Sequence, residues 1–194
     1  SATEHLTARP ADTSGAVDAL RSGDPACTVA LDLSRGATGA VHTYDFADPS
    51  VLTVGERYYA FGTNGPAGTI QVLSSTDLQH WEIRPDALRS LPAWAQAGQT
   101  WAPAVHRIGE RYVMYYAVHA RSSGKHCISV ATSAAPAGPY VDDSTGPLVC
   151  QTRLGGSIDP DVYTDGFGFA HLIWKSDGSS ADQPARIWSQ YLGV

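Results

Sequence analysis

Two Asp-Pro pairs, Asp48-Pro49 and Asp159-Pro160, carry the side chains best suited to chemistry in this chain of 194 residues. Each pair begins a hydrophobic, strand-like segment, and the two aspartates are 111 residues apart. A third copy of the segment has Ala102 in place of the aspartate. Two carboxylates facing one open pocket suit glycoside hydrolysis, in which one carboxylate activates water and a separate acid protonates the leaving oxygen.

The segment occurs three times, as DPSVLTVGERYYAFGT from residue 48, APAVHRIGERYVMYYA from residue 102 and DPDVYTDGFGFAHLIW from residue 159. The starts are 54 and 57 residues apart, and each unit divides into short strands. Repeats of this length predict an all-β fold of β-propeller blades, each of four antiparallel strands. Equivalent positions of successive blades surround one axis, so we expect Asp48 and Asp159 to face the same pocket.

An isolated Asp-Pro pair is most often a turn at the junction of a loop and a strand. Here the pair recurs at the same phase of two repeats, which favours a functional role. We expect each proline to hold the preceding aspartate in extended backbone. Asp45 and Asp161 fall outside the repeated phase and rank lower as site residues.

The domain organisation follows from the repeat. Residues 41–194 are predicted to form a partial propeller, and residues 1–40 an irregular leader with one possible strand, Cys27–Leu31. The blades are expected at about 45–84, 101–143 and 157–194, the last being truncated. Fewer than three blades are present, whereas a ring needs at least about four. We therefore expect the missing blades to come from a continuation or from another chain.

Within blade two, the fourth strand is expected at residues 140–142, and residues 84–100 are expected to form a linker that precedes the blade. Turn signals such as Asn64-Gly65-Pro66 separate the strands of blade one.

The composition excludes several classes of partner. The net charge is −6 and the basic residues are scattered, which argues against a nucleic-acid surface. No apolar run approaches the length of a membrane span. The expected partner is an oligo- or polysaccharide, with neither nucleic acid nor membrane involved.

Three cysteines, Cys27, Cys127 and Cys150, occur without a CxxC spacing. This pattern fits a secreted, extracellular protein with one disulfide better than a zinc site. Cys127 begins the third strand of blade two, and Cys150 lies just past its fourth. Because neighbouring strands lie about 4.8 Å apart, we predict a Cys127–Cys150 disulfide, with Cys27 free or paired elsewhere.

Several motifs together resemble those of glycoside hydrolase family 43. They are residues 46–51 (FADPSV), 75–81 (STDLQHW), 100–103 (TWAP), 126–133 (HCISVATS) with 138–140 (GPY), and 156–161 (GSIDPD). The resemblance covers about residues 41–190. That family consists of five-bladed propellers that hydrolyse arabinose- and xylose-containing polysaccharides with inversion. The resemblance implies that Asp48 is the general base. It also implies that Asp159 is the pKa modulator, which raises the pKa of the general acid and orients the substrate.

The general acid of that family is a glutamate that begins an inner strand of the following blade. None of the four glutamates has this phase: Glu56 and Glu110 lie in turns, Glu82 in an outer strand and Glu4 in the leader. The resemblance therefore implies that the acid is not in this chain, and that the chain alone is inactive. Ala104 also departs from the family, in which many members have an acidic residue after Trp-Ala-Pro.

Aromatic residues near the repeat starts are candidates for substrate binding. Phe46, Trp94 and Trp101 are predicted to stack on sugar rings, with packing between blades as the alternative. His42 and His106 have no partners at metal-ligand spacing, so we expect no metal and no cofactor. The resemblance alone allows a cation near the channel, held by a histidine of a later blade.

The leading interpretation is an α-L-arabinofuranosidase or arabinanase that takes part in arabinan or xylan degradation. A β-xylosidase and a non-catalytic carbohydrate-binding propeller are the alternatives. A protein-interaction propeller is disfavoured, because such a scaffold does not need two carboxylates at repeated positions around its axis.

Overall fold

The computed structural model describes residues 39–193. The chain divides into one unit at Ser1–Ala40 and a second at Val41–Val194, and every described strand belongs to the second unit. The expected leader and its possible strand at Cys27–Leu31 lie outside the described residues. Among the residues described, none belongs to a helix long and apolar enough to cross a membrane.

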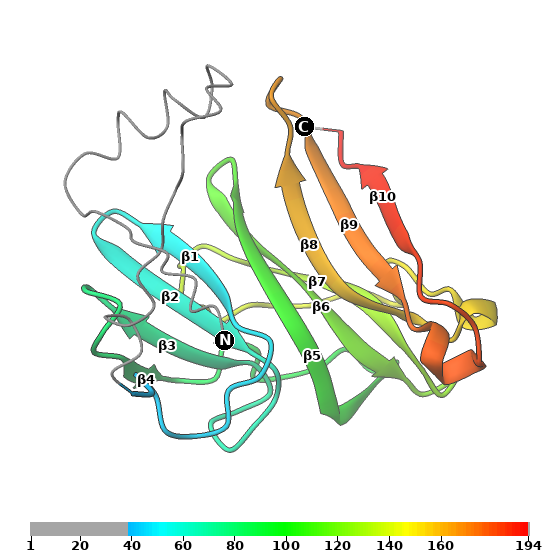
Figure 1. The fold of residues 1–194 in the computed structure, drawn as a ribbon, viewed down its shortest axis with the longest axis horizontal. Helices are drawn as coiled ribbons and strands as arrows, with labels where there is room; N and C mark the ends of the chain where they lie inside the picture. Colours follow the sequence, from blue (N-terminus) through cyan, green and yellow to red (C-terminus); the bar gives the residue numbers. More distant parts are fainter. Residues whose placement is uncertain (1–38, 194) are drawn as a thin grey trace, which may run out of the picture. The chain divides into compact units, whose positions relative to one another are not determined.

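Blade one is a four-stranded antiparallel sheet in the order β1-β2-β3-β4 (Figure 1). Its strands are β1 (Ser50–Val54), β2 (Arg57–Gly62), β3 (Gln71–Ser75) and β4 (Glu82–Arg84). The tight turn between β1 and β2 contains Gly55, whose φ of 59° lies in the left-handed region that glycine adopts without cost. Blade one thus has the predicted four strands.

Blade two departs from the prediction at both of its ends. Its sheet has three strands, β5 (Ala95–Ile108), β6 (Arg111–Ala120) and β7 (Lys125–Ser133). Because β5 begins at Ala95, the last third of the expected linker is strand. The expected fourth strand at residues 140–142 is also wrong. Only isolated bridges form there, between Thr132 and Val141 and between Ile128 and Val149.

A half-buried carboxylate helps to hold this region, which lacks a full strand. Asp142 Oδ2 accepts hydrogen bonds from Tyr116 Oη at 2.6 Å and from Ser129 Oγ at 2.5 Å. Asp142 Oδ1 accepts from the backbone N–H of Ser144 at 2.9 Å. Side-chain bonds to one aspartate therefore add to the few backbone bonds that join this segment to β7, such as those between Thr132 and Val141. Burial and this carboxylate together raise the pKa of Tyr116 far above its ordinary value.

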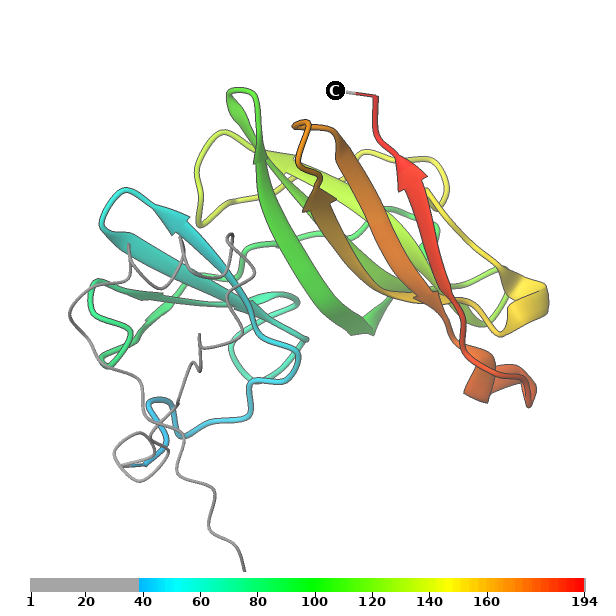
Figure 2. The same ribbon diagram turned by 45° about the horizontal axis from the view of Figure 1, so that its top comes forward.

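Blade three contains β8 (Ser157–Thr164), β9 (Ala170–Ser176) and β10 (Ile187–Tyr191), in the order β10-β9-β8. Short 3-10 helices precede and interrupt it, at Thr152–Leu154 and Gly178–Ala181. Figure 2 shows the three sheets following one another in chain order, with β5 and β8 as neighbours.

Blade two is buried on both faces, and β6 shows this directly. Met114, Tyr116 and Val118 belong to a core shared with blade one, whereas Tyr115 belongs to a second core shared with blade three. This explains why β6 is a nearly continuous apolar run and lacks the alternation of a one-sided strand. Each fully buried large side chain contributes roughly 1.5–3 kcal/mol to holding neighbouring blades together.

The predicted disulfide is confirmed: Cys127 is bonded to Cys150, with 4.6 Å between the Cα atoms. The bridge between Ile128 and Val149 brings the two segments side by side. Cys27 lies outside the described residues.

Candidate active site

The same irregularity occurs at the repeated position of each blade, within β5 and β8 and immediately before β1. In each blade, the residue that starts the repeat and the proline after it oppose a single residue of the next strand. The opposed residues are Gly62, Tyr116 and Trp174. This two-against-one arrangement is a β-bulge, a common place for proline because the ladder needs no donor there.

The three residues that start the repeat share one backbone conformation. Asp48, Ala102 and Asp159 have φ values of 52°, 45° and 53°, all in the left-handed region. The expectation of extended backbone before each proline is therefore wrong. The bulge inserts one extra residue into the strand, and the left-handed conformation accommodates it. Aspartate tolerates this conformation better than most residues, whereas alanine adopts it at a cost.

The bulges bring the repeat starts together around one pocket of about 390 Å³. The pocket is lined by three consecutive residues from the start of each repeat: Asp48, Pro49, Ser50, Ala102, Pro103, Ala104, Asp159, Pro160 and Asp161. Asp48 and Asp159 are both exposed to solvent. Two carboxylates far apart in the sequence thus open into the same space, where a polar ligand can reach both.

Thr63 holds the carboxylate of Asp48. Its Oγ1 lies 2.6 Å from Asp48 Oδ2 and 3.0 Å from the backbone nitrogen of Ala102. Because the hydroxyl accepts the Ala102 N–H, its own proton is available to donate to Asp48. The bond uses Oδ2 of Asp48, so a water molecule in the pocket can approach Oδ1.

Lys175 holds the carboxylate of Asp159, with Nζ 2.8 Å from Asp159 Oδ2. The hydrogen bond to Asp159 raises the pKa of Lys175 above its ordinary value, against the opposing effect of partial burial. The negative charges of Asp177 and Asp48 add to this rise in the pKa of Lys175. The ammonium group therefore lies in the negative field of the site as a whole.

Asp161 lines the pocket too, although its sequence position ranked it below the repeated aspartates. Its Oδ1 lies 3.0 Å from His106 Nε2 and accepts the backbone N–H of Val162 at 2.8 Å. The backbone N–H of Val162 also lies 3.4 Å from His106 Nε2, so His106, Asp161 and Val162 form one cluster beside the pocket. His106 therefore reaches the site through a carboxylate.

The three aromatic candidates lie outside the residues that line this pocket. Phe46 lies beside Gly62 and lines a separate hollow with His42 and Tyr44. Trp94 packs against the core between blades one and two, and its Nε1 donates to Ser144 Oγ at 3.0 Å. Their binding of sugar stays a prediction.

Trp101 stacks on His126, with ring centroids 3.6 Å apart and planes inclined by 20°. Burial lowers the pKa of His126 to about 4, and the neighbouring His119 contributes to that decrease. His126 Nε2 is buried without a hydrogen-bond partner in the part of the chain that the structure describes. One face of Trp101 is thus occupied by a neutral imidazole.

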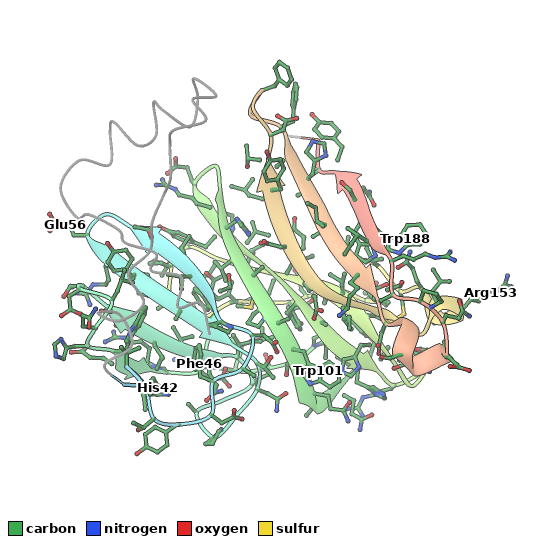
Figure 3. The ribbon with its side chains drawn as sticks, in the orientation of Figure 1. His42, Phe46, Glu56, Trp101, Arg153 and Trp188 are labelled. Carbon is green, nitrogen blue, oxygen red and sulfur yellow. A yellow bond between two sulfur atoms is a disulfide. The ribbon has the colours of Figure 1, made fainter. Side chains whose placement is uncertain are left out.

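The glutamates among the described residues lie in the turns and the outer strand that were predicted for them. Glu56 and Glu110 are in the turns between β1 and β2 and between β5 and β6, and Glu82 is the first residue of β4. Figure 3 shows Glu56 at the far end of blade one from Phe46. Trp101 lies near the middle of β5, whereas Glu110 lies in the turn after its last residue. Within residues 39–193, no glutamate lines the pocket.

Among residues 39–193, no three or more histidine, cysteine or acidic side chains are arranged to hold a metal ion.

The sequence profile of glycosyl hydrolases family 43 matches residues 38–193. The chain belongs to this family. An extracellular endo-α-(1→5)-L-arabinanase of Thermotoga petrophila is 36% identical over 161 residues, which cover 66% of this chain and 33% of the relative. An extracellular exo-α-(1→5)-L-arabinofuranosidase of Cellvibrio japonicus is 31% identical over 147 residues, which cover 70% of this chain and 41% of the relative.

Solved structures of family 43 share the fold. The crystal structure of a thermostable family-43 glycoside hydrolase superposes with a TM-score of 0.65 at 26% identity, covering 76% of this chain and 48% of that one. An endo-arabinase of Bacteroides thetaiotaomicron gives the same TM-score at 21% identity, with 78% and 52% covered. This family 43 chain spans about a third to two fifths of the length of these curated relatives.

Proposed function

We propose that the chain provides the base-carrying part of an inverting glycoside hydrolase that acts on arabinose- or xylose-containing polysaccharides. The observation that carries this proposal is the shared pocket. Asp48 and Asp159 occupy the same bulge position of two blades and open into one cavity of about 390 Å³. Membership of family 43 supports the same reaction class.

Asp48 is the proposed general base. Thr63 binds its Oδ2, so Oδ1 is the oxygen that takes a proton from the attacking water. The carboxylate lies at the open mouth of the pocket, where water has direct access. General-base assistance of this kind typically accelerates a reaction by about 10²–10⁴-fold.

Asp159 is the proposed pKa modulator. A negative charge near a carboxylic acid disfavours loss of the proton and so raises the pKa of that acid. In the proposed reaction, Asp159 keeps the general acid protonated and also orients the sugar through hydrogen bonds. Its place in the same pocket as Asp48 supports this division of labour.

The general acid is proposed to come from outside the described blades, because no glutamate of residues 39–193 lines the pocket. Protonation of the leaving oxygen needs an acid across the pocket from the base. The 194-residue chain is therefore expected to be inactive alone. A polypeptide or assembly that adds the remaining blades with their glutamate is termed the acid-containing form.

The names of the relatives support α-L-arabinofuranosidase or arabinanase activity ahead of β-xylosidase activity. The arabinanase and the arabinofuranosidase that match this chain are 36% and 31% identical, whereas a putative β-xylosidase of Xylanibacter ruminicola is 26% identical. Secretion is part of the proposal as well. Both arabinan-degrading relatives are named extracellular, and disulfides such as Cys127–Cys150 persist in oxidising compartments.

A non-catalytic carbohydrate-binding propeller is the second candidate. The absence of a glutamate from the pocket lining, within the described residues, is the observation that favours it. In that case both carboxylates hydrogen-bond sugar hydroxyls and no bond is cleaved.

Hydrolysis assays separate the two candidates. Purified chain and acid-containing form are each incubated with arabinan, 4-nitrophenyl α-L-arabinofuranoside and 4-nitrophenyl β-D-xyloside. The proposal predicts turnover by the acid-containing form and none by the chain alone. Sugar binding without turnover by both supports the binding module. Turnover by the chain alone shows that the acid lies within it.

A further inference from the structure

Within the described residues, the carboxylates of Asp48 and Asp159 each have one side-chain partner, and the two partners come from the same position of the repeat. Thr63 pairs with the residue just before Asp48, through its backbone N–H to the carbonyl of Ala47 at 3.0 Å. In blade three, Lys175 pairs with Ile158, the residue just before Asp159. Lys175 lies on β9 and Thr63 directly follows the end of β2, and each is next to the residue that opposes the bulge.

The middle blade supplies an internal control. There the residue at this position is Ala117, which pairs with Trp101 just before the bulge. The bulge residue itself is Ala102, which has no carboxylate. Blade two thus lacks both the acid and its partner, while blades one and three have both. The two positions change together across the three repeats.

We infer that this one position of the repeat supplies a dedicated positioning residue for each carboxylate of the site. Thr63 serves Asp48 in blade one. Lys175 serves Asp159 in blade three. Neither side chain is among those that line the pocket, so each acts through its carboxylate. The inference rests on the proposed function and adds the residues that make two equivalent aspartates chemically different.

The two partners differ in charge, and that difference assigns the roles. A threonine hydroxyl fixes the orientation of Asp48 and leaves its negative charge in place, which suits a base. The ammonium group of Lys175 offsets much of the charge of Asp159 at 2.8 Å. Lys175 therefore limits how far the negative charge of Asp159 raises the pKa of the general acid.

A lysine titration tests the blade-three half without any substrate. The chain has only two lysines, Lys125 and Lys175, so selective ¹⁵N labelling gives two side-chain signals. Asp159→Asn is expected to lower the pKa of Lys175, because the main source of its rise is removed. Lys125→Met assigns the signals, and Asp159→Asn should leave the Lys125 signal in place. An unmoved Lys175 titration overturns the inference.

Crystal structures of Thr63 variants and one control variant test the blade-one half. In Thr63→Val the carboxylate of Asp48 is expected to rotate away, whereas in Thr63→Ser it keeps its orientation. Thr63→Ala is the second loss variant, because Ala117 shows that the repeat accepts alanine at this position. Thr53→Val, on the exposed side of β1, is the matched control. An unmoved Asp48 in both loss variants overturns this half.

The acid-containing form adds a functional readout. Lys175→Met is expected to move the alkaline limb of the pH–rate profile upward, because an uncompensated Asp159 raises the pKa of the acid further. Lys175→Arg should restore the wild-type limb. A downward shift or none contradicts the assigned role. Since the titration and the crystal structures need no activity, a failure of the proposed function leaves them interpretable.

Discussion

The hydroxyl of Thr63 accepts a hydrogen bond from the backbone N–H of Ala102, at 3.0 Å and 39 residues further along the chain. The same hydroxyl donates to Asp48, so the base in blade one is anchored to the bulge of blade two. The middle repeat has no acid at its start, yet its backbone takes part in the site. The left-handed conformation of Ala102 presents that N–H.

Ala102→Gly is expected to stabilise the protein by about 0.5–1 kcal/mol. Relief of the left-handed strain gains roughly 1–2 kcal/mol, and the greater flexibility of glycine in the unfolded chain costs part of it. Urea denaturation measures the change. Ala104→Gly is the control, since Ala104 is buried in the same strand without a positive φ and should lose stability. A destabilised Ala102→Gly would mean that the backbone there is unstrained.

The pKa of His126 predicts how stability depends on pH. Burial lowers this pKa from 6.5 to about 4, so the folded protein holds a neutral imidazole where the unfolded chain binds a proton. The associated stability is present above about pH 6.5 and is lost as the pH falls toward 4. Urea midpoints at pH 7.5 and 4.5 check this, with His126→Phe expected to flatten the difference. If His126→Phe shows the same difference between the two urea midpoints as the wild type, His126 is excluded as the cause.

Asp142→Ala should destabilise blade two by about 2–4 kcal/mol, because Tyr116, Ser129 and the Ser144 backbone all lose their acceptor in a partly buried region. Thermal unfolding gives the change. Asp143→Ala removes an exposed carboxylate one residue away and should have little effect. Comparable losses in the two variants would argue against the network.

Asp159→Asn in the acid-containing form should lower the rate and move the alkaline limb of the pH–rate profile downward. Removal of the negative charge lets the acid lose its proton at lower pH, so the protonated fraction falls earlier as pH rises. The shift is opposite in sign to that expected for Lys175→Met. If the alkaline limb does not move, Asp159 binds the substrate and does not set the pKa of the acid.

The repeat made the blades and the two aspartates predictable from sequence, because equivalent phases of a propeller must surround one axis. The backbone of Asp48 was not predictable in the same way. The steric rule for a residue before proline favours an extended backbone. Only the pairing with the next strand shows that a bulge is present, in which two residues oppose one.

The partners of the two carboxylates could not be predicted from the sequence, for a related reason. Thr63 and Ala117 each follow their repeat start by 15 residues, but Lys175 follows Asp159 by 16. The hairpin between β8 and β9 is longer, with five residues between Thr164 and Ala170, and this shifts the alignment by one. Equivalence therefore appears only from the register of the strands. Asp161 lies outside the repeated phase, two residues beyond Asp159, and the register across the bulge places it in the lining of the same pocket.

The measurement that most directly tests the account is the turnover of Asp48→Asn in the acid-containing form on 4-nitrophenyl α-L-arabinofuranoside. Asparagine keeps the shape of the side chain and cannot accept the proton of the attacking water. The account predicts that kcat falls by about 10²–10⁴-fold or more while the affinity for arabino-oligosaccharides is retained. A variant that turns over substrate at close to the wild-type rate would contradict the assignment of Asp48 as the base.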